Sequence, residues 1–357
     1  MARMTAGRAT VEGTRRYTER FRARLAGGHF RELDGGVALS TLDAILRSLE
    51  LGINVIDTAV NYRHQRSERA IRTALATAIA KGVVRRDEVV VATKGGFIPF
   101  DGAGPRDPRA HFAATYVDTG IIKPGDVASG AHCMTPRYLR DQIDRSRANL
   151  GLETLDVYYL HNPETQLDEV ERGEFLIRMR AAFEALEEAV SAGSIARYGT
   201  ATWTGFRADP DAPDYLSLAE LVAMARDVGG NDHHFNVIQL PYNLGMTEAF
   251  TRANQRVDGG LVPVLQAARQ LGVSVMASAS VHQGQLTRNL PPLIAELIPG
   301  LVSDAQRALQ FVRSTPGVGT ALVGMRSPAH VEENAKVGAV PPMAWEQFQR
   351  LFSAVGG

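Results

Sequence analysis

The segments VVVATK (residues 89–94) and LDVYYLH (residues 155–161) indicate the fold most directly. Each is a short, mostly apolar run rich in β-branched or aromatic residues, and each ends on a polar side chain, Lys94 or His161. A run that stays apolar, instead of alternating with polar residues, is typical of a parallel strand buried on both faces. The two segments therefore predict a parallel sheet whose faces are covered by helices.

The same unit, an apolar run followed by an amphipathic helical pattern, recurs from residue 53 to the end of the chain. The expected strands are Ile53–Thr58, Val89–Lys94, Leu155–His161, Arg197–Thr202, Val237–Asn243, Val273–Ser280 and Thr320–Met325. The expected helices include Ser67–Ala80, Pro136–Leu150, Phe175–Ala192, Leu261–Leu271 and Asp304–Ser314. Strict alternation of strands and helices implies right-handed crossovers and one all-parallel sheet.

The spacing of the strand ends predicts an α/β fold, a TIM (β/α)8-type barrel. Successive strand ends are separated by similar lengths of chain, except for one longer step that contains residues 95–135. This segment is rich in Gly, Pro, Asp and Ala, and irregular loops of such length inside a domain are usually functional or mobile. We expect this insertion to overhang the catalytic face of the barrel.

A closed barrel of this type has eight strands, and the pattern supplies seven. The missing strand should precede the helix expected at Leu42–Leu51, where only His29–Leu33 and Val37–Leu42 are available. Asp34-Gly35-Gly36 separates these two runs, and Asp-Gly between short apolar runs is typical of a β-hairpin. We expect this hairpin to plug the barrel floor, which leaves the first wall strand absent or remodelled.

Composition excludes several classes of function. The chain has 357 residues with 39 basic and 39 acidic side chains, so no overall field favours nucleic acid or a membrane surface. The single cysteine, Cys133, excludes an internal disulfide framework. His132-Cys133 and His233-His234 lack the ligand spacing of a metal site and are more typical of exposed loop residues, so no metal is expected. No apolar run approaches the roughly 20 residues of a membrane helix, and we predict a cytoplasmic protein whose oligomeric state is unknown.

The first 28 residues carry seven arginines against two glutamates, Glu12 and Glu19. This excess of positive charge predicts a flexible basic arm at residues 1–28. Residues 29–357 are expected to form a single barrel domain that includes the insertion at about 95–135, because α/β barrels of 250 residues or more fold as one unit.

Polar side chains follow three consecutive strands at the point where each is expected to end. Asp57 and then Tyr62 follow the first, Lys94 ends the second and His161 ends the third. Because the carboxyl ends of parallel strands meet at the catalytic face of a barrel, we expect the four side chains to converge. The chain has only four lysines among its 39 basic residues, so a lysine that ends an apolar strand is a specific signal.

Grouped in this way, the four side chains suit the donation of a proton to a carbonyl group. A neighbouring ammonium favours loss of a phenol proton, so Lys94 would make Tyr62 a stronger acid, and Asp57 would hold Lys94 charged and in place. His161 would orient the substrate carbonyl or share the proton relay. Alone, Asp57 could cap the next helix, Tyr62 could pack in its loop and His161 could be a core histidine. Four such structural roles at the ends of three consecutive strands would be a coincidence, so we favour a shared catalytic role.

The motifs Asp57-Thr-Ala with Tyr62, Ala92-Thr-Lys94 and Leu160-His161 resemble those of the aldo-keto reductase family, and the similarity runs from about Phe30 to Asn334. Two further motifs strengthen it: Gln239-Leu-Pro-Tyr-Asn243 and Gly324-Met-Arg-Ser-Pro-Ala-His330-Val-Glu-Glu333-Asn334. The resemblance implies a TIM barrel that reduces an aldehyde or ketone, a small-molecule carbonyl substrate, to an alcohol with NADPH, or with NADH as the alternative. It assigns the catalytic tetrad to Asp57, Tyr62, Lys94 and His161, with Tyr62 as the acid.

The resemblance also implies cofactor-binding residues, and here the chain departs from the family. The implied set is Gln239, Ser278, Arg326, Glu333 and Asn334. Ser278 replaces the aromatic residue that stacks on the nicotinamide, and Ala201-Thr202 replaces the family's Ser-Asn. Gly324 and His330 stand where the family usually offers cations to the 2′-phosphate, which leaves Arg326 as the nearest cation. The acid and base groups are complete, whereas the cofactor site has fewer of its usual groups.

These departures leave two alternatives to a reductase open. If loss of the first strand removed cofactor binding, then Tyr62, Lys94 and His161 would serve a redox-neutral acid/base enzyme, an isomerase, dehydratase or cyclase. A non-catalytic binding or regulatory subunit is the other alternative, and the intact tetrad argues against it.

Overall fold

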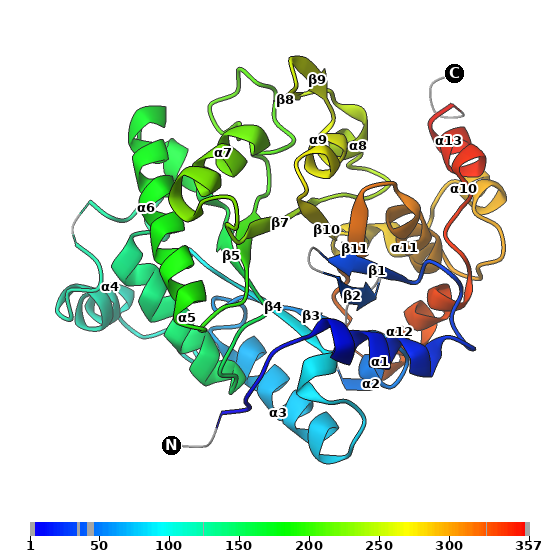
Figure 1. Ribbon diagram of the computed structural model, residues 1–357, viewed down its shortest axis with the longest axis horizontal. Helices are drawn as coiled ribbons and strands as arrows, with labels where there is room; N and C mark the ends of the chain where they lie inside the picture. Colours follow the sequence, from blue (N-terminus) through cyan, green and yellow to red (C-terminus); the bar gives the residue numbers. More distant parts are fainter. Residues whose placement is uncertain (1–3, 34–35, 41–45, 124, 326, 354–357) are drawn as a thin grey trace.

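The computed structural model describes residues 4–33, 36–40, 46–123, 125–325 and 327–353. Seven parallel strands form one curled sheet in the order β11-β10-β7-β6-β5-β4-β3, and helices surround it (Figure 1). The strands are β3 Val55–Asp57, β4 Val90–Gly95, β5 Val157–His161, β6 Tyr198–Ala201, β7 Phe235–Pro241, β10 Ser274–Ser278 and β11 Val318–Ala321. Each of the seven runs expected from the sequence is therefore confirmed as a strand, with ends that shift by a few residues.

The main helices lie between the strands, and α3, α5, α6 and α7 pack against one another in that order. The main helices are α3 Arg66–Ala80, α5 Pro136–Leu150, α6 Arg172–Ser191, α7 Leu218–Gly229, α9 Val264–Gln270 and α11 Asp304–Ser314. Helix α5 shows why the local sequence sets these limits. It starts with Pro136, which needs no N–H partner in the first turn, and it stops at Gly151, which adopts a left-handed φ of 67°.

Shorter elements complete the fold and connect the main ones. They are α2 Leu46–Leu49, η1 Arg86–Glu88, α4 Pro108–Phe112, η2 Ala113–Val117, η3 Pro163–Asp168, α8 Glu248–Thr251, β8 Gln255–Val257, β9 Gly260–Val262, η4 His282–Thr287, α10 Pro292–Leu297, α12 Pro328–Ala335, η5 Lys336–Ala339 and α13 Trp345–Ser353. No helix in the described part of the chain is long and apolar enough to cross a bilayer.

A hairpin closes one end of the barrel. Strands β1 (Phe30–Leu33) and β2 (Val37–Ser40) pair antiparallel, as the sequence predicts. Leu33 and Val37 are buried in a cluster with inward-facing residues of the wall strands, such as Val90 and Met276. The hairpin is therefore the floor of the barrel. Among the described residues no eighth strand joins β3 to β11, and part of the expected run from Leu39 into the helix ending at Leu51 lies outside them.

The structure corrects the expectation of a flexible basic arm at residues 1–28. Residues 11–21 form helix α1 (Val11–Phe21), which packs on the barrel. Tyr17 is fully buried, and its hydroxyl donates to the carbonyl oxygen of Leu49 at 2.7 Å. Arg16 and Arg20 both pair with the buried carboxylate of Glu88, at 3.0 and 2.9 Å. The excess of arginine thus reflects ion pairs with the barrel, and not only contact with solvent.

Gly13 provides a test of how α1 is docked. A Cβ atom at this position would lie 2.2 Å from the carbonyl oxygen of Asp87, a backbone atom that cannot rotate away. We expect Gly13→Ala to lower the free energy of unfolding by about 1–3 kcal/mol, although alanine is the better helix former. Gly27→Ala is the control, because a Cβ there has no neighbour within 4 Å. Equal urea midpoints for the two variants would contradict the docking of α1.

The insertion at residues 95–135 is packed and carries its own small apolar core. Tyr116, Ile122 and Cys133 are buried there together with Tyr138 of α5. The edges of the insertion meet at a bridge between Phe97 and His132. The insertion is therefore anchored to the barrel, and its two ends lie next to the strand ends described below.

Candidate active site

An ion pair joins the ends of the first two wall strands. Asp57 is the last residue of β3 and Lys94 lies near the end of β4. The Lys94 Nζ atom is 2.6 Å from Asp57 Oδ2, and it also donates to the carbonyl oxygen of Thr58 at 2.7 Å. Lys94 is fully buried and Asp57 nearly so. A buried charge is tolerated only with such partners, so this pair fixes the lysine in place.

Gln239 joins this pair from the opposite side of the barrel. Its Nε2 atom, on β7, donates to Asp57 Oδ1 at 2.9 Å. Both oxygens of Asp57 are thus engaged, one by an ammonium and one by an amide. The structure therefore places Gln239, a cofactor contact implied by the resemblance, in contact with the predicted tetrad.

Tyr62 lies above the ion pair and reaches solvent. Lys94 Nζ is 5.2 Å from the centre of the Tyr62 ring, and that ring meets the His161 ring edge-on at 5.9 Å. Tyr62 is 40% exposed, whereas Lys94 is fully buried. A turn of three consecutive residues with left-handed φ, Arg63 to Gln65, directs the chain from Tyr62 into α3. The four predicted catalytic residues therefore lie together, with the phenol on the open side.

His161, the last residue of β5, presents a neutral imidazole. Burial, the Lys94 charge and His132 together hold the pKa of His161 well below its ordinary value. Its Nδ1 atom is buried and has no hydrogen-bond partner among the described residues. A neutral ring with an unsatisfied nitrogen is suited to bind a polar atom of a ligand.

The insertion supports His161 through His132, which the sequence reading placed among exposed loop residues. That expectation is wrong, because His132 and Cys133 are both buried. The His132 Nε2 atom lies 2.8 Å from the His161 carbonyl oxygen, and Gln166 Nε2 lies 2.8 Å from His132 Nδ1. Phe97 meets both histidine rings at 5.1 Å. The two ends of the insertion thus hold His161 from the side.

The pH dependence of stability tests the burial of His132. Burial lowers the pKa of His132 to about 4, against about 6.5 in an unfolded chain. Between pH 4 and pH 6.5 the unfolded state therefore binds more protons at His132 than the folded state does. The contribution of the neutral His132 to the free energy of unfolding is complete above pH 6.5 and is lost as the pH falls toward 4. Each pKa unit between the folded and unfolded states is worth about 1.36 kcal/mol, so the loss of stability amounts to about 3 kcal/mol.

We therefore expect the stability advantage of the wild type over His132→Asn to shrink by about 3 kcal/mol between pH 7 and pH 4. Urea unfolding at several pH values measures it. His330→Asn, at an exposed position on α12, is the control for loss of an imidazole. A difference between the wild type and His132→Asn that does not change with pH would show that His132 is solvated.

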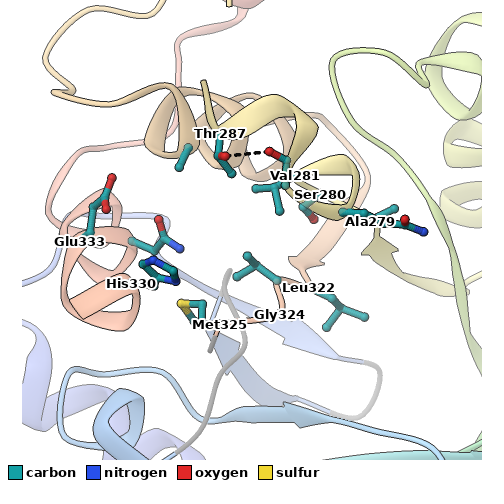
Figure 2. Close-up of a pocket in the computed structure, with 14 residues that line it drawn as sticks. Ala279, Ser280, Val281, Thr287, Leu322, Gly324, Met325, His330 and Glu333 are labelled. Atoms are coloured by element: carbon teal, nitrogen blue, oxygen red, sulfur yellow. Dashed lines mark hydrogen bonds between the residues drawn. The ribbon is translucent and has the colours of Figure 1, made fainter. Parts of the chain in front are cut away.

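A large cavity opens beyond the ends of β10 and β11, and none of the four predicted catalytic residues is among the residues that line it. Its volume is about 940 Å³. Figure 2 shows its walls: Ala279 to Val281 follow β10, Leu322 to Met325 follow β11, and His330 and Glu333 project from α12. Asn334 also lines the cavity, and its Oδ1 atom is buried without a partner among the described residues.

The remaining predicted cofactor residues are placed only in part. Glu333 lines the cavity and accepts a hydrogen bond from Ser303. Ser278 ends β10, immediately before the cavity residue Ala279. Arg326 lies outside the described residues. The described part of the chain has no cluster of three or more histidine, cysteine or acidic residues that could hold a metal ion.

Sequence reasoning also missed the role of Glu164, which lies just after β5. Its Oε1 atom accepts hydrogen bonds from the backbone N–H groups of Trp203, Thr204 and Gly205, at 2.6, 3.1 and 3.5 Å. Burial raises the pKa of Glu164, and these N–H groups oppose that rise. The carboxyl group thus fixes the loop after β6 at the edge of the site.

Comparison with known proteins gives consistent matches over most of the chain. A family model described as "Aldo/keto reductase family" matches residues 37–293. A D-threo-aldose 1-dehydrogenase from Pseudomonas sp. is 25% identical over 344 residues, which cover 90% of each protein.

Two solved structures show the same fold. The holo form of an aldo-keto reductase from Bacillus halodurans has a TM-score of 0.62 at 21% identity, and the match covers 91% of this chain and 95% of that one. An aldo/keto reductase from Klebsiella pneumoniae, in complex with NADP and acetate, has a TM-score of 0.59 at 19% identity with the same coverage. At these identities the two structures support the fold alone.

Proposed function

This chain belongs to the aldo/keto reductase family of oxidoreductases, and from that premise we propose that it reduces an aldehyde or ketone to an alcohol with Tyr62 as the proton donor. One observation carries the proposal. A buried ammonium, Lys94, lies on Asp57 beneath the exposed phenol of Tyr62. In this position the ammonium would oppose the negative charge that develops on the phenol oxygen as the proton passes to a carbonyl.

The cavity beyond β10 and β11 opens at the carboxyl ends of the strands, as the tetrad does, and its size suits a nicotinamide cofactor. Its volume of about 940 Å³ is at the upper end of the range for small-molecule and cofactor sites. The Asn334 Oδ1 atom has no hydrogen-bond partner among the described residues, so it is free to accept a hydrogen bond from a ligand. We propose that Glu333 and Asn334 hold the cofactor within the cavity, with Gln239, Ser278 and Arg326 as further contacts. The bound cofactor would supply a hydride to the carbonyl carbon.

The protein's own side chains then handle the oxygen of the substrate. Tyr62 donates its proton to the carbonyl oxygen, and with the hydride on carbon this completes the alcohol. Lys94 stabilises the phenolate, and Asp57 keeps Lys94 charged. The neutral His161 is placed to hold the carbonyl oxygen through a ring nitrogen.

NADPH is the expected cofactor, and NADH is the alternative. Among the described residues that line the cavity, only His330 can carry the positive charge that a 2′-phosphate requires. Arg326, which adjoins the cavity residue Met325 in sequence, would add a second cation. A cytoplasmic location also stays a prediction.

A redox-neutral function is the second candidate, and one observation favours it. Within the described residues the sheet has seven strands, and none joins β3 to β11, where the family's first wall strand would lie. If cofactor binding depends on that strand, then Tyr62, Lys94 and His161 would catalyse an isomerisation, dehydration or cyclisation by proton transfer alone.

Titration with nucleotide separates the two candidates. We expect NADPH to quench the protein's tryptophan fluorescence in a saturable manner, with a dissociation constant between about 1 μM and 1 mM. NADH in a parallel titration measures the contribution of the 2′-phosphate. Absence of binding at millimolar concentrations of both nucleotides would rule out the reductase and leave the redox-neutral candidate.

A further inference from the structure

The backbone of His161 leaves the sheet at the point where β4 and β5 end. The last residues that these two strands pair are Gly95 and Leu160, so among the described residues His161 has no register partner on β4. On the side of β6 the next residue, Asn162, still donates its N–H to the carbonyl oxygen of Ala201 at 2.6 Å. The His161 carbonyl oxygen is therefore open to a donor from outside the sheet, and the His132 Nε2 atom lies 2.8 Å from it.

Gln166 and Arg178 decide which nitrogen of His132 carries the proton. The Arg178 Nη1 atom, which can only donate, lies 2.6 Å from Gln166 Oε1. The amide nitrogen of Gln166 therefore points to His132, where it donates to Nδ1 at 2.8 Å and to the backbone carbonyl oxygen at 3.2 Å. A ring nitrogen that accepts a hydrogen bond carries no proton. The proton of the neutral ring is therefore on Nε2, the atom that faces the His161 carbonyl oxygen.

A glycine leaves the space for this contact. Gly96 has a φ of 147°, and a Cβ atom there would lie 2.7 Å from His132 Nε2 and 2.9 Å from the His161 carbonyl oxygen. The next residue, Phe97, meets both histidine rings edge-on at 5.1 Å. The His161 ring thus contacts Phe97 and Tyr62, while the His161 backbone is fixed by His132.

The chain of hydrogen bonds connects three parts of the fold. Arg178 lies on α6, Gln166 on η3 and His132 near the end of the insertion. Arg178 is itself fixed by Glu174 at 2.9 Å, and it donates to the carbonyl oxygen of Gly125, within the insertion, at 3.4 Å. Gln166 and His132 are both buried. A buried chain of this kind is rigid, because any displacement leaves a desolvated polar group without its partner.

We propose that His132 is a positioning residue for His161, and that Gln166 and Arg178 hold it in its donating state. The inference rests on the proposed function, in which the His161 ring holds the carbonyl oxygen of the substrate. A displacement of about 1 Å at a reacting centre can cost about 100-fold in rate, so the place of the His161 backbone matters to catalysis. The insertion at residues 95–135 then aligns the catalytic residues, in addition to its expected place over the catalytic face.

Gln166→Glu tests the proposal because it reverses the proton on His132 at almost constant volume. The carboxylate cannot donate, so a neutral His132 gives its Nδ1 proton to Glu and turns an unprotonated Nε2 toward the His161 carbonyl oxygen. At lower pH the ring carries both protons, and the bond to His161 returns. His161 from β5 and, through residue 166, Arg178 from α6 are the titratable or charged groups that face His132.

We therefore expect the kcat of Gln166→Glu, relative to the wild type, to fall about tenfold as the pH rises and His132 loses a proton. NADPH and 4-nitrobenzaldehyde are the probe substrates, and the pH runs from about 5 to about 9. A ratio of kcat values that stays constant over this range would contradict the proposal.

Gln310→Glu is the matched control. Gln310 is also buried, its Oε1 atom accepts from Arg313 at 2.8 Å, and its Nε2 atom donates to the carbonyl oxygen of Pro341 at 2.7 Å. No histidine is among its hydrogen-bond partners in the described part of the chain. The kcat of this variant relative to the wild type should not depend on pH. The same pH dependence in both variants would assign the effect to a buried carboxylate and overturn the proposal.

Two substitutions of His132 separate positioning from the filling of space. The amide nitrogen of His132→Gln reaches the place of Nε2 and can donate to the His161 carbonyl oxygen, so we expect most of the kcat to remain. His132→Leu has no donor, and its kcat should fall about 10- to 100-fold. The dissociation constant of NADPH should stay within about twofold in both, because His132 does not line the cavity. Equal losses of kcat in the two variants would show that His132 only fills space.

NMR of 15N-labelled histidine gives a measurement that does not depend on turnover. In the wild type, His132 should carry its proton on Nε2, and in Gln166→Glu at high pH the proton should be on Nδ1. A wild-type His132 protonated on Nδ1 would refute this inference, whether or not an aldehyde is reduced. Absence of NADPH binding and of aldehyde reduction in the wild type would instead refute the proposed function, and the position of the His132 proton could still be measured.

Discussion

Replacement of Tyr62 by Phe is expected to lower kcat for carbonyl reduction by about 10²- to 10⁴-fold, the usual worth of a positioned general acid. The change removes only the hydroxyl group. The ring keeps its edge-on contact with His161 at 5.9 Å and its place over Lys94 at 5.2 Å, so the geometry of the site should persist. The dissociation constant of NADPH should therefore stay within about twofold, because no proton is transferred on binding.

Tyr215→Phe is a matched control for that experiment. Tyr215 lies just before α7, and its hydroxyl donates to the carbonyl oxygen of Asn254 at 2.8 Å and to no predicted catalytic residue. Its loss should leave kcat unchanged. An unchanged kcat in Tyr62→Phe as well would exclude Tyr62 as the acid. A non-catalytic binding protein would show no turnover in the wild type or in either variant, so the same measurements also separate an enzyme from a regulatory subunit.

The wall strands and the convergence of the four predicted catalytic side chains were predictable because their signals are local. Each wall strand is a continuous apolar run, and burial on both faces leaves such a sequence few alternatives to a parallel strand. The sheet register then brings polar strand ends together without any further information. Asp57 and Lys94 lie on adjacent strands, β3 and β4, so their contact at 2.6 Å follows from two runs of apolar residues and a parallel pairing.

The supporting contacts were not predictable, because their partners are distant in sequence. His132 contacts the His161 carbonyl and Gln166, which are 29 and 34 residues away. Glu164 accepts hydrogen bonds from backbone N–H groups that are 39 to 41 residues away in the sequence. A local pattern cannot reveal such pairs. Helix α1 is different, since Gly13, Thr14, Tyr17 and Phe21 form a buried stripe at helical spacing that the count of arginines obscured.

Lys94→Met is expected to give the largest loss of stability, about 3–5 kcal/mol in urea unfolding, together with a loss of at least 10²-fold in kcat. The substitution keeps the length of the side chain but leaves the Asp57 carboxylate nearly buried with only the Gln239 amide as a partner. Lys81→Met is the control. Lys81 is exposed at the end of α3, so this change should stay within about 0.5 kcal/mol of the wild type.

The double variant Asp57→Asn/Lys94→Met separates the cost of an unpaired charge from the chemistry of the ammonium. It removes both charges, and an asparagine oxygen can still accept from Gln239 Nε2, as Asp57 Oδ1 does at 2.9 Å. We expect more than half of the stability lost in Lys94→Met to return, because replacing a whole buried ion pair costs far less than breaking it. Activity should not return, since no ammonium is left to stabilise the Tyr62 phenolate. Recovery of kcat together with stability would mean that Lys94 acts only by holding the fold, and that proton donation by Tyr62 does not need the ammonium.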